Sequence, residues 1–156
     1  MNIYKKYKTI HVIPISLGLF GLIPYLIFFL NNFLNLYNFF YMMNLVLIYS
    51  SLILSFMAAV YWGMALNQMH EYNCIKNIKP GHLFILSIVL FIFGLLFFVF
   101  EQKEGVLLLL LGFTLCQMID EYIYFKINKM NWYIILRRFL TLIVVSTLIY
   151  CYINLR

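Results

Sequence analysis

Charge is the scarcest feature of this 156-residue sequence, because Asp, Glu, Lys and Arg together make up only 10% of it. A soluble domain carries about 25% charged residues, so this chain lacks the polar surface that coats a fold in water. The hydrophobic fraction of 65% suits a lipid environment instead, since acyl chains are as apolar as Leu and Phe. The composition therefore predicts a membrane protein.

The sequence also lacks the usual patterns of catalysis and of metal or cofactor binding. Its three cysteines lie far apart with no CxxC pair, so neither a disulfide framework nor a zinc site is expected. No Gly-rich phosphate loop or nucleophile elbow occurs. His11, His70 and His82 fall at helix ends or in a loop, away from the mid-membrane depth of a bis-histidine haem site. We therefore expect no enzyme activity, no metal and no cofactor.

Long apolar runs are what the sequence has in abundance. A helix needs about 20 residues to cross the hydrocarbon core. Five stretches qualify, at about residues 10–30, 41–66, 82–100, 106–126 and 132–153. The alternating pattern of membrane strands is absent. The sequence thus predicts an all-α bundle of about five transmembrane helices, a single domain over residues 1–156 whose partner is the lipid bilayer.

The basic residues divide unevenly between the two sides that these helices would connect. The formal net charge is +6, and no long Lys/Arg cluster suggests a nucleic-acid partner. One side collects the basic residues Lys5, Lys6, Lys8, Lys76, Lys79, Lys126, Lys129, Arg137 and Arg138. The other side has only Lys103 and Arg156. Because basic loops stay inside, we predict an N-terminus inside and a C-terminus outside.

Charged residues enter the last two apolar runs. The fourth run is apolar only over residues 106–119, so a full crossing carries Asp120 and Glu121 below the interface. The fifth run carries Arg137 and Arg138 in the same way. An antiparallel hairpin places the two groups at matching depth, so we predict that one acid pairs with one arginine. Consecutive residues point in different directions, so only one member of each group is expected to face the partner helix.

Gln117, Asp120, Glu121 and Tyr124 follow the i, i+3, i+4, i+7 spacing of one helix face. This polar stripe should face protein rather than lipid. Two roles remain open for it. The ion pair either pins the helical hairpin, as its position near the interface favours, or forms a proton or anion site, because intramembrane ionisable residues are often functional.

Small residues recur every four positions along the second run, at Ser51, Ser55, Ala59 and Gly63, with Trp62 beside the last of them. Small-xxx-small repeats let two helix backbones approach closely. We therefore predict a helix-packing face rather than a ligand pocket.

In the first run Pro24 lies inside the membrane. Proline removes a backbone hydrogen bond and clashes with the preceding turn. The sequence therefore predicts a kink at Pro24.

Three segments read together carry a family resemblance: LGLFGLIPY at 17–25, YSSLILSFMAAVYWGMAL at 49–66 and WYIILRRFLT at 132–141. They resemble the small membrane family catalogued as domain of unknown function 3429, which includes the animal transmembrane protein 69. The resemblance runs from the first span to the last, with Asp120 and Arg137 where the family's acidic residue and arginine are expected. It implies a bacterial or mitochondrial inner membrane and implies no reaction.

Two functions from different classes fit these observations. The first is a structural or accessory component that helps to assemble a membrane complex, as the short loops and the small-residue face suggest. The second is a small transporter or a lipid- or quinone-handling protein that uses the polar site at Asp120, Glu121 and Arg137. The five spans show no obvious internal repeat, which weakens the transporter interpretation.

Overall fold

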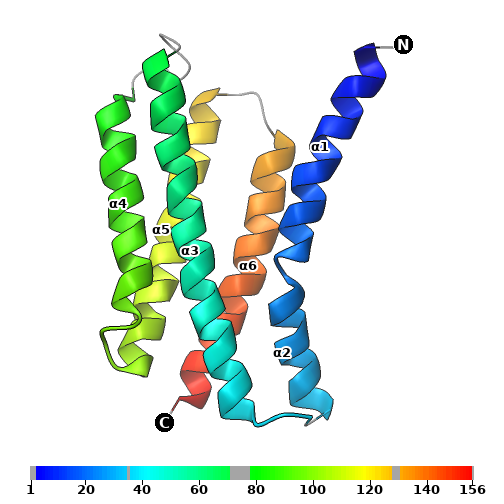
Figure 1. The fold of residues 1–156 in the computed structure, drawn as a ribbon, viewed down its shortest axis with the longest axis vertical. Helices are drawn as coiled ribbons and strands as arrows, with labels where there is room; N and C mark the ends of the chain where they lie inside the picture. Colours follow the sequence, from blue (N-terminus) through cyan, green and yellow to red (C-terminus); the bar gives the residue numbers. More distant parts are fainter. Residues whose placement is uncertain (1–2, 35, 71–77, 128–130, 156) are drawn as a thin grey trace.

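The computed structural model describes residues 3–34, 36–70, 78–127 and 131–155. These residues form six α-helices and contain no strand (Figure 1). The helices are α1 (Ile3–Phe20), α2 (Ile23–Leu34), α3 (Phe39–His70), α4 (Pro80–Leu96), α5 (Gln102–Ile127) and α6 (Asn131–Asn154). The prediction of an all-α fold is confirmed.

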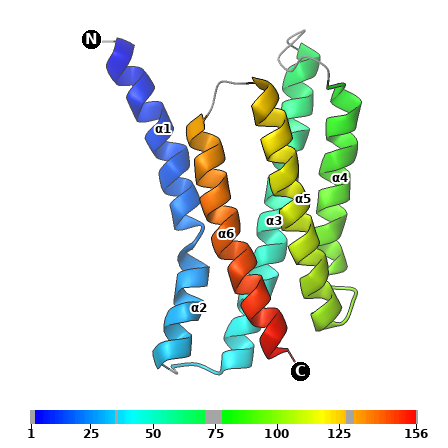
Figure 2. The same ribbon diagram turned by 180° about the vertical axis from the view of Figure 1, so that it is seen from behind.

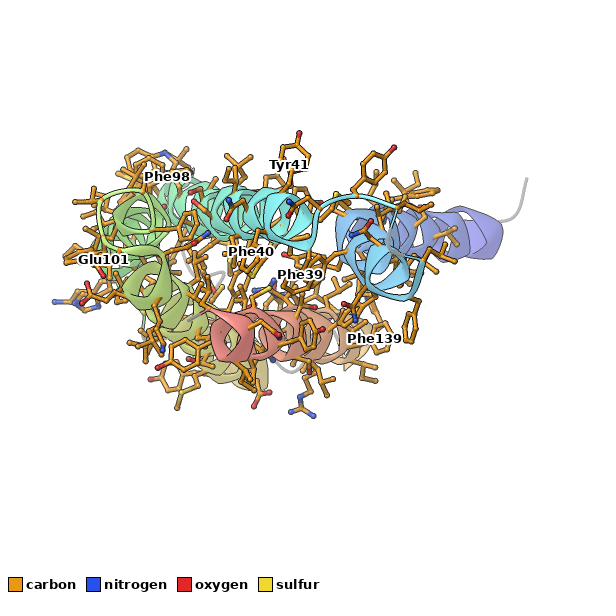
Figure 3. The ribbon with its side chains drawn as sticks, turned by 90° about the horizontal axis from the view of Figure 1, so that it is seen from below. Phe39, Phe40, Tyr41, Phe98, Glu101 and Phe139 are labelled. Atoms are coloured by element: carbon orange, nitrogen blue, oxygen red, sulfur yellow. The ribbon has the colours of Figure 1, made fainter. Side chains whose placement is uncertain are left out.

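The helices run up and down along one long axis, and α1 and α2 continue each other as a single broken crossing (Figures 1 and 2). The N-terminus and the C-terminus lie at opposite ends of the bundle. Seen from its end, the bundle has two layers, with α4, α3 and the α1–α2 pair above α5 and α6 (Figure 3). The central helix α3 packs most extensively against α4 and also meets α2, α5 and α6.

Four segments are long and apolar enough to cross a membrane: Val12–Leu34, Phe39–Met69, Gln102–Tyr124 and Trp132–Asn154. A fifth apolar helix, α4, is shorter, with 17 residues and a length of about 26 Å. Many large apolar side chains on the outside of the bundle are exposed, as a lipid-facing surface requires. The chain is therefore a helical membrane bundle.

The first crossing is interrupted three residues before Pro24, at Gly21 and Leu22, rather than kinked at the proline itself. The proline ring acts on the preceding turn, because it lacks the N–H that would bond four residues back and clashes with that carbonyl. The hydroxyl of Tyr49 on α3 donates to the Gly21 carbonyl at 2.9 Å. A neighbouring helix thus satisfies a backbone group exposed by the break.

The predicted small-residue face of α3 packs against α4 over only part of its length. The Ser51 hydroxyl donates to the Gly94 carbonyl at 2.8 Å, and a Cβ added at Gly94 would lie 2.8 Å from the Ser55 oxygen. Further along α3, Ala59 and Gly63 are exposed, and a Cβ added at Gly63 would meet nothing within 4 Å. The packing prediction therefore fails for these two residues within this chain.

The reason is helical rotation. Each step of four residues turns about 40° away from a straight line along the helix, so a strict four-residue repeat winds off the contact face. The buried face of α3 follows three- and four-residue steps through Ser51, Leu54, Ala58, Tyr61 and Ala65. Trp62 is 45% exposed, and its ring meets Phe84 of α4 edge-on at 4.7 Å.

The close approach of α3 and α4 gives a first prediction. Gly94→Ala should lower the free energy of unfolding by about 1–3 kcal/mol, because the new methyl group would crowd Ser55 and the Ser51 backbone. Thermal unfolding of the purified protein in mild detergent would measure the change. Gly63→Ala is the matched control, since its methyl group enters open space and should be neutral or slightly stabilising. Equal effects at both positions would contradict this account of the interface.

Candidate functional site

A buried ion pair joins α5 to α6. The Arg137 Nε donates to an Asp120 carboxylate oxygen at 2.6 Å, and the two residues are only 7% and 3% exposed. Asp120 precedes the end of α5 by seven residues and Arg137 follows the start of α6 by six, so both lie about 10 Å inside their helices. The structure thus brings together two of the residues that the sequence singled out, at matching depth.

A tyrosine from the central helix completes the surroundings of the carboxylate. The Tyr61 hydroxyl donates to the second oxygen of Asp120 at 2.6 Å and lies 3.1 Å from the Cys116 carbonyl. Sequence reasoning missed Tyr61. A usable signal existed, because a tyrosine within an apolar span needs a hydrogen-bond partner for its hydroxyl. The Asp120 carboxylate therefore accepts hydrogen bonds at both oxygens, from two different helices.

The outer end of the Arg137 side chain points away from Asp120 and toward sulfur. One terminal nitrogen donates to the Met57 sulfur, and the other donates to the Cys116 sulfur at 3.0 Å. A thioether and a thiol are weak acceptors. The guanidinium is therefore bound strongly on its Asp120 side and only weakly on the opposite side.

A second ion pair runs beside the first on the outer surface. Arg138 Nε donates to a Glu121 oxygen at 2.9 Å, and the two side chains are 61% and 43% exposed. Only Asp120 and Arg137 are buried in the interface between α5 and α6, as expected for one member of each consecutive pair, but the sequence did not predict that Glu121 and Arg138 would also pair. Neighbouring residues point in different directions, so the inner pair joins α5 to α6 inside the bundle. The side chains of the outer pair are long enough to meet at the surface, beside the line of contact between the two helices.

The rest of the polar stripe extends the contact between α5 and α6. Gln117 donates to Glu121 at 3.1 Å and accepts from the Thr141 hydroxyl at 3.0 Å. The Tyr124 ring packs against the Tyr133 ring at 4.7 Å. Asp120 is the fully buried member, whereas Gln117, Glu121 and Tyr124 are half-buried. The stripe thus faces α6 at its centre and reaches the surface at its edge.

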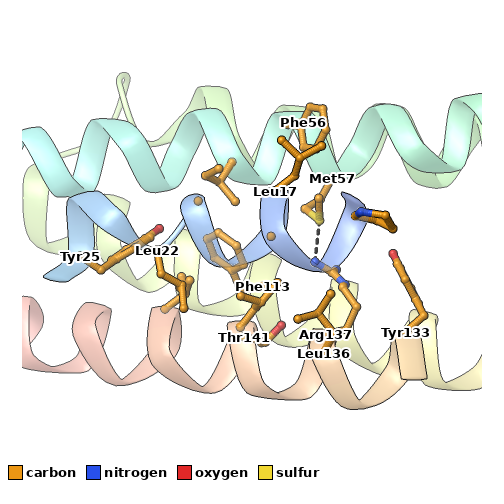
Figure 4. Close-up of a pocket in the computed structure, with 16 residues that line it drawn as sticks. Leu17, Leu22, Tyr25, Phe56, Met57, Phe113, Tyr133, Leu136, Arg137 and Thr141 are labelled. Atoms are coloured by element: carbon orange, nitrogen blue, oxygen red, sulfur yellow. Dashed lines mark hydrogen bonds between the residues drawn. The ribbon is translucent and has the colours of Figure 1, made fainter. Parts of the chain in front are cut away.

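An apolar cavity of about 420 Å³ lies on the other side of Arg137, between the α1–α2 pair, α3 and α6, with Phe113 of α5 also in its wall (Figure 4). Most of its wall is apolar, with the exceptions of Arg137, Thr141 and two tyrosines. In Figure 4, Arg137, Met57 and Tyr133 gather at one end and Tyr25 lies at the other. Asp120 does not line the cavity, so the ion pair presents its cationic, hydrogen-donating side to this space.

Among the histidines, only the side chain of His82 is described, and it takes no part in this site. His82 is exposed in the first turn of α4, and the side chains of His11 and His70 lie outside the described residues. Within the part of the chain that the structure describes, no group of three or more metal-binding side chains gathers. The chemistry available here is hydrogen-bond donation from a charge-compensated arginine into an apolar space.

A family model described as "Protein of unknown function (DUF3429)" matches residues 10–153. The chain belongs to the DUF3429 family. The match spans every crossing of the DUF3429 bundle and includes Asp120 and Arg137, so the resemblance seen in the sequence is confirmed. No curated protein and no solved structure matches the chain significantly.

Proposed function

We propose that this DUF3429 protein is a lipid- or quinone-handling protein that binds an amphipathic molecule in its cavity, within a bacterial or mitochondrial inner membrane. The observation that carries the proposal is the Arg137 guanidinium in the wall of an otherwise apolar cavity. Ligand pockets typically combine apolar walls with a few convergent polar groups, in volumes of about 300–1,000 Å³. The cavity of about 420 Å³ fits this description.

Two residues that line the cavity support entry of a lipid-like ligand from the bilayer. Leu17 of α1 and Phe56 of α3 line the cavity and are 65% and 64% exposed, more than a closed cavity would allow. A space bounded by residues that also face lipid is open to the bilayer. An acyl or prenyl chain can therefore enter sideways without crossing water.

A pathway for polar solutes has less support. Asp120 is sealed behind Arg137 and Tyr61 and does not reach the cavity. The apolar wall offers little to a hydrated ion or metabolite, since removing polar groups from water is costly without partners. These contacts favour a lipid-like ligand over a transported polar one.

Filling the cavity tests the proposal. Leu140→Trp should place an indole in the cavity, which Leu140 lines, and should abolish binding of lipid-like molecules without breaking the ion pair. Native mass spectrometry of the purified protein would count the amphiphiles that remain bound. The matched control is Leu142→Trp on the opposite face of α6, where residue 142 is 66% exposed and the indole faces lipid.

Loss of bound amphiphile in Leu140→Trp but not in Leu142→Trp is the expected result. The same occupancy in both variants would reject the proposed function.

A second candidate, the accessory role in a membrane complex, is supported by the outer face of α3 and α4. There Ala59 and Trp62 line a shallow groove with Ile88 and Phe91 of α4, and Gly63 follows on the same exposed surface. Small exposed residues on a membrane helix allow another helix to approach closely. The same mild-detergent preparations distinguish the two roles. A co-migrating subunit of fixed stoichiometry, unaffected by Leu140→Trp, would favour the accessory role.

A further inference from the structure

We propose that the cavity selects an uncharged amphiphile whose polar end presents a carbonyl oxygen, a chemistry shared by prenyl quinones and neutral acyl esters. This inference rests on the proposed function, because it names the class of ligand that the lipid-binding cavity would hold. Three features carry it: the charge of the wall, the direction of its donors and the partners of its other polar groups.

The charge of the cavity wall is already balanced. Arg137 is the only charged residue among those described as lining the cavity, and Asp120 lies 2.6 Å from its Nε. A single arginine paired with a single carboxylate has no net charge. An anionic head would add an unbalanced negative charge to a low-dielectric space, which is costly. The site therefore disfavours phosphate, sulfate and ionised carboxylate heads.

The donors that face the cavity are held by weak acceptors. Both terminal nitrogens of Arg137 have sulfur partners among the described residues, and the nitrogen bound to Met57 lies on the cavity side, as the dashed line in Figure 4 shows. Met57 itself lines the cavity, and a methionine side chain moves easily between rotamers. A carbonyl oxygen is a stronger acceptor than a thioether. It can therefore replace the Met57 sulfur on this N–H.

The other polar groups of the wall have their protons engaged elsewhere. Thr141 donates to Gln117 at 3.0 Å, and the Tyr133 hydroxyl is hydrogen-bonded to Tyr124. Tyr25, at the far end, donates to the Ser50 hydroxyl, which itself donates to the Val46 carbonyl. Arg137 is thus the donor whose present partner is easiest to displace.

This arrangement fixes the direction of the ligand. Its polar end would lie against Arg137, and its chain would run along α6 toward Val144, which also lines the cavity. Seven residues of helix separate these two positions, a distance of about 10 Å. The carbonyl head therefore lies at the Arg137 end and the chain begins in apolar surroundings.

A chain-matched series of probes tests the charge of the head. The intact purified protein would be titrated with methyl oleate, oleyl sulfate and 1-octadecene, which share a long chain and differ in the head. Methyl oleate should bind at least about tenfold more tightly than either of the others, since only it offers a neutral carbonyl acceptor. Decylubiquinone and dioleoylglycerol, run beside them, distinguish a quinone from an acyl ester as the natural source.

Asp120→Asn is the decisive variant. The amide is nearly isosteric with the carboxylate, but it leaves the Arg137 charge uncompensated. The preference should then reverse, so that oleyl sulfate binds about tenfold more tightly than methyl oleate. Met57→Leu is a second variant that leaves both charges in place. It removes the competing acceptor and should tighten methyl oleate about two- to tenfold.

The outcomes separate the two proposals. If the wild type binds oleyl sulfate as tightly as methyl oleate and Leu140→Trp abolishes both, the head-group inference is wrong and the proposed function stands. If Leu140→Trp leaves every probe bound as before, both proposals are wrong. If Asp120→Asn unfolds, the test rests on Met57→Leu, which keeps both charges. An unchanged affinity of Met57→Leu for methyl oleate would overturn the head-group inference.

Discussion

Arg137→Leu is expected to lower the free energy of unfolding by about 3–5 kcal/mol, the largest stability loss of any single substitution proposed for this protein. The substitution leaves the Asp120 carboxylate, only 3% exposed, without its cationic partner. The Tyr61 hydroxyl would remain as a donor, but one neutral hydrogen bond does not compensate a buried charge. Chemical unfolding of the purified protein in detergent, followed by far-UV circular dichroism, would measure the loss.

The matched control is Arg138→Leu, which removes a guanidinium one residue along the same helix. Its partner is the Glu121 carboxylate, and both side chains are well exposed, so the expected change is about 0–1 kcal/mol. The double variant Asp120→Leu/Arg137→Leu should recover most of the stability lost by Arg137→Leu, because no unpaired buried charge remains. The stabilising role of the buried Asp120–Arg137 pair would be contradicted if the stability losses were additive in the double variant. It would also be contradicted if the two arginine variants lost equal stability.

The contact between α5 and α6 could be predicted from the sequence because membrane depth limits the possible partners. The apolar run before Asp120 is too short to cross, and so is the run after Arg137. Asp120 and Arg137 must therefore both enter the membrane, and their similar distances from the intervening loop place them at the same depth. The formation of two pairs rather than one could not be predicted in the same way. It depends on side-chain length and on the rotation of each helix about its axis.

The sequence indicates that the Tyr61 hydroxyl of α3 needs a hydrogen-bond partner, but for a related reason it does not indicate which partner. Tyr61 and Met57 contact the ion pair only because α3 turns their face toward α5 and α6. Loop lengths and hydropathy do not specify that rotation. The predicted small-residue repeat at Ser55, Ala59 and Gly63 gave a different face, and only its first turns pack against α4.

The cavity is the least predictable feature. It lies where α1 and the break at Gly21 and Leu22 border α3 and α6, and Pro14, Leu17 and Gly18 of α1 form much of that side of its wall. A proline in the sequence indicates that a helix is disturbed, but not how far the two halves separate. Local sequence rules therefore predicted the ion pair, whereas the shape of the neighbouring cavity depends on how five helices pack together.

The orientation of the bundle gives the last prediction. A reporter fused to the C-terminus of the full chain is expected outside, and the same reporter at the N-terminus inside. Nine of the eleven basic residues lie on the N-terminal side of the predicted topology, and only Lys103 and Arg156 lie on the other. Basic residues near the ends of membrane helices resist translocation, so the more basic side should stay in the cytoplasm or matrix. Protease accessibility of the two reporters in sealed vesicles would measure their sides.

The two reporters together separate the fold from its orientation. Because the termini lie at opposite ends of the bundle, a bundle with five crossings places the reporters on opposite sides whichever way it inserts. If both change sides, the charge argument fails while the five crossings stand. If both lie on the same side, one crossing is missing. The short helix α4, with 17 residues and a length of about 26 Å, would be the first to examine, because it is the crossing nearest to the minimum span of the hydrocarbon core.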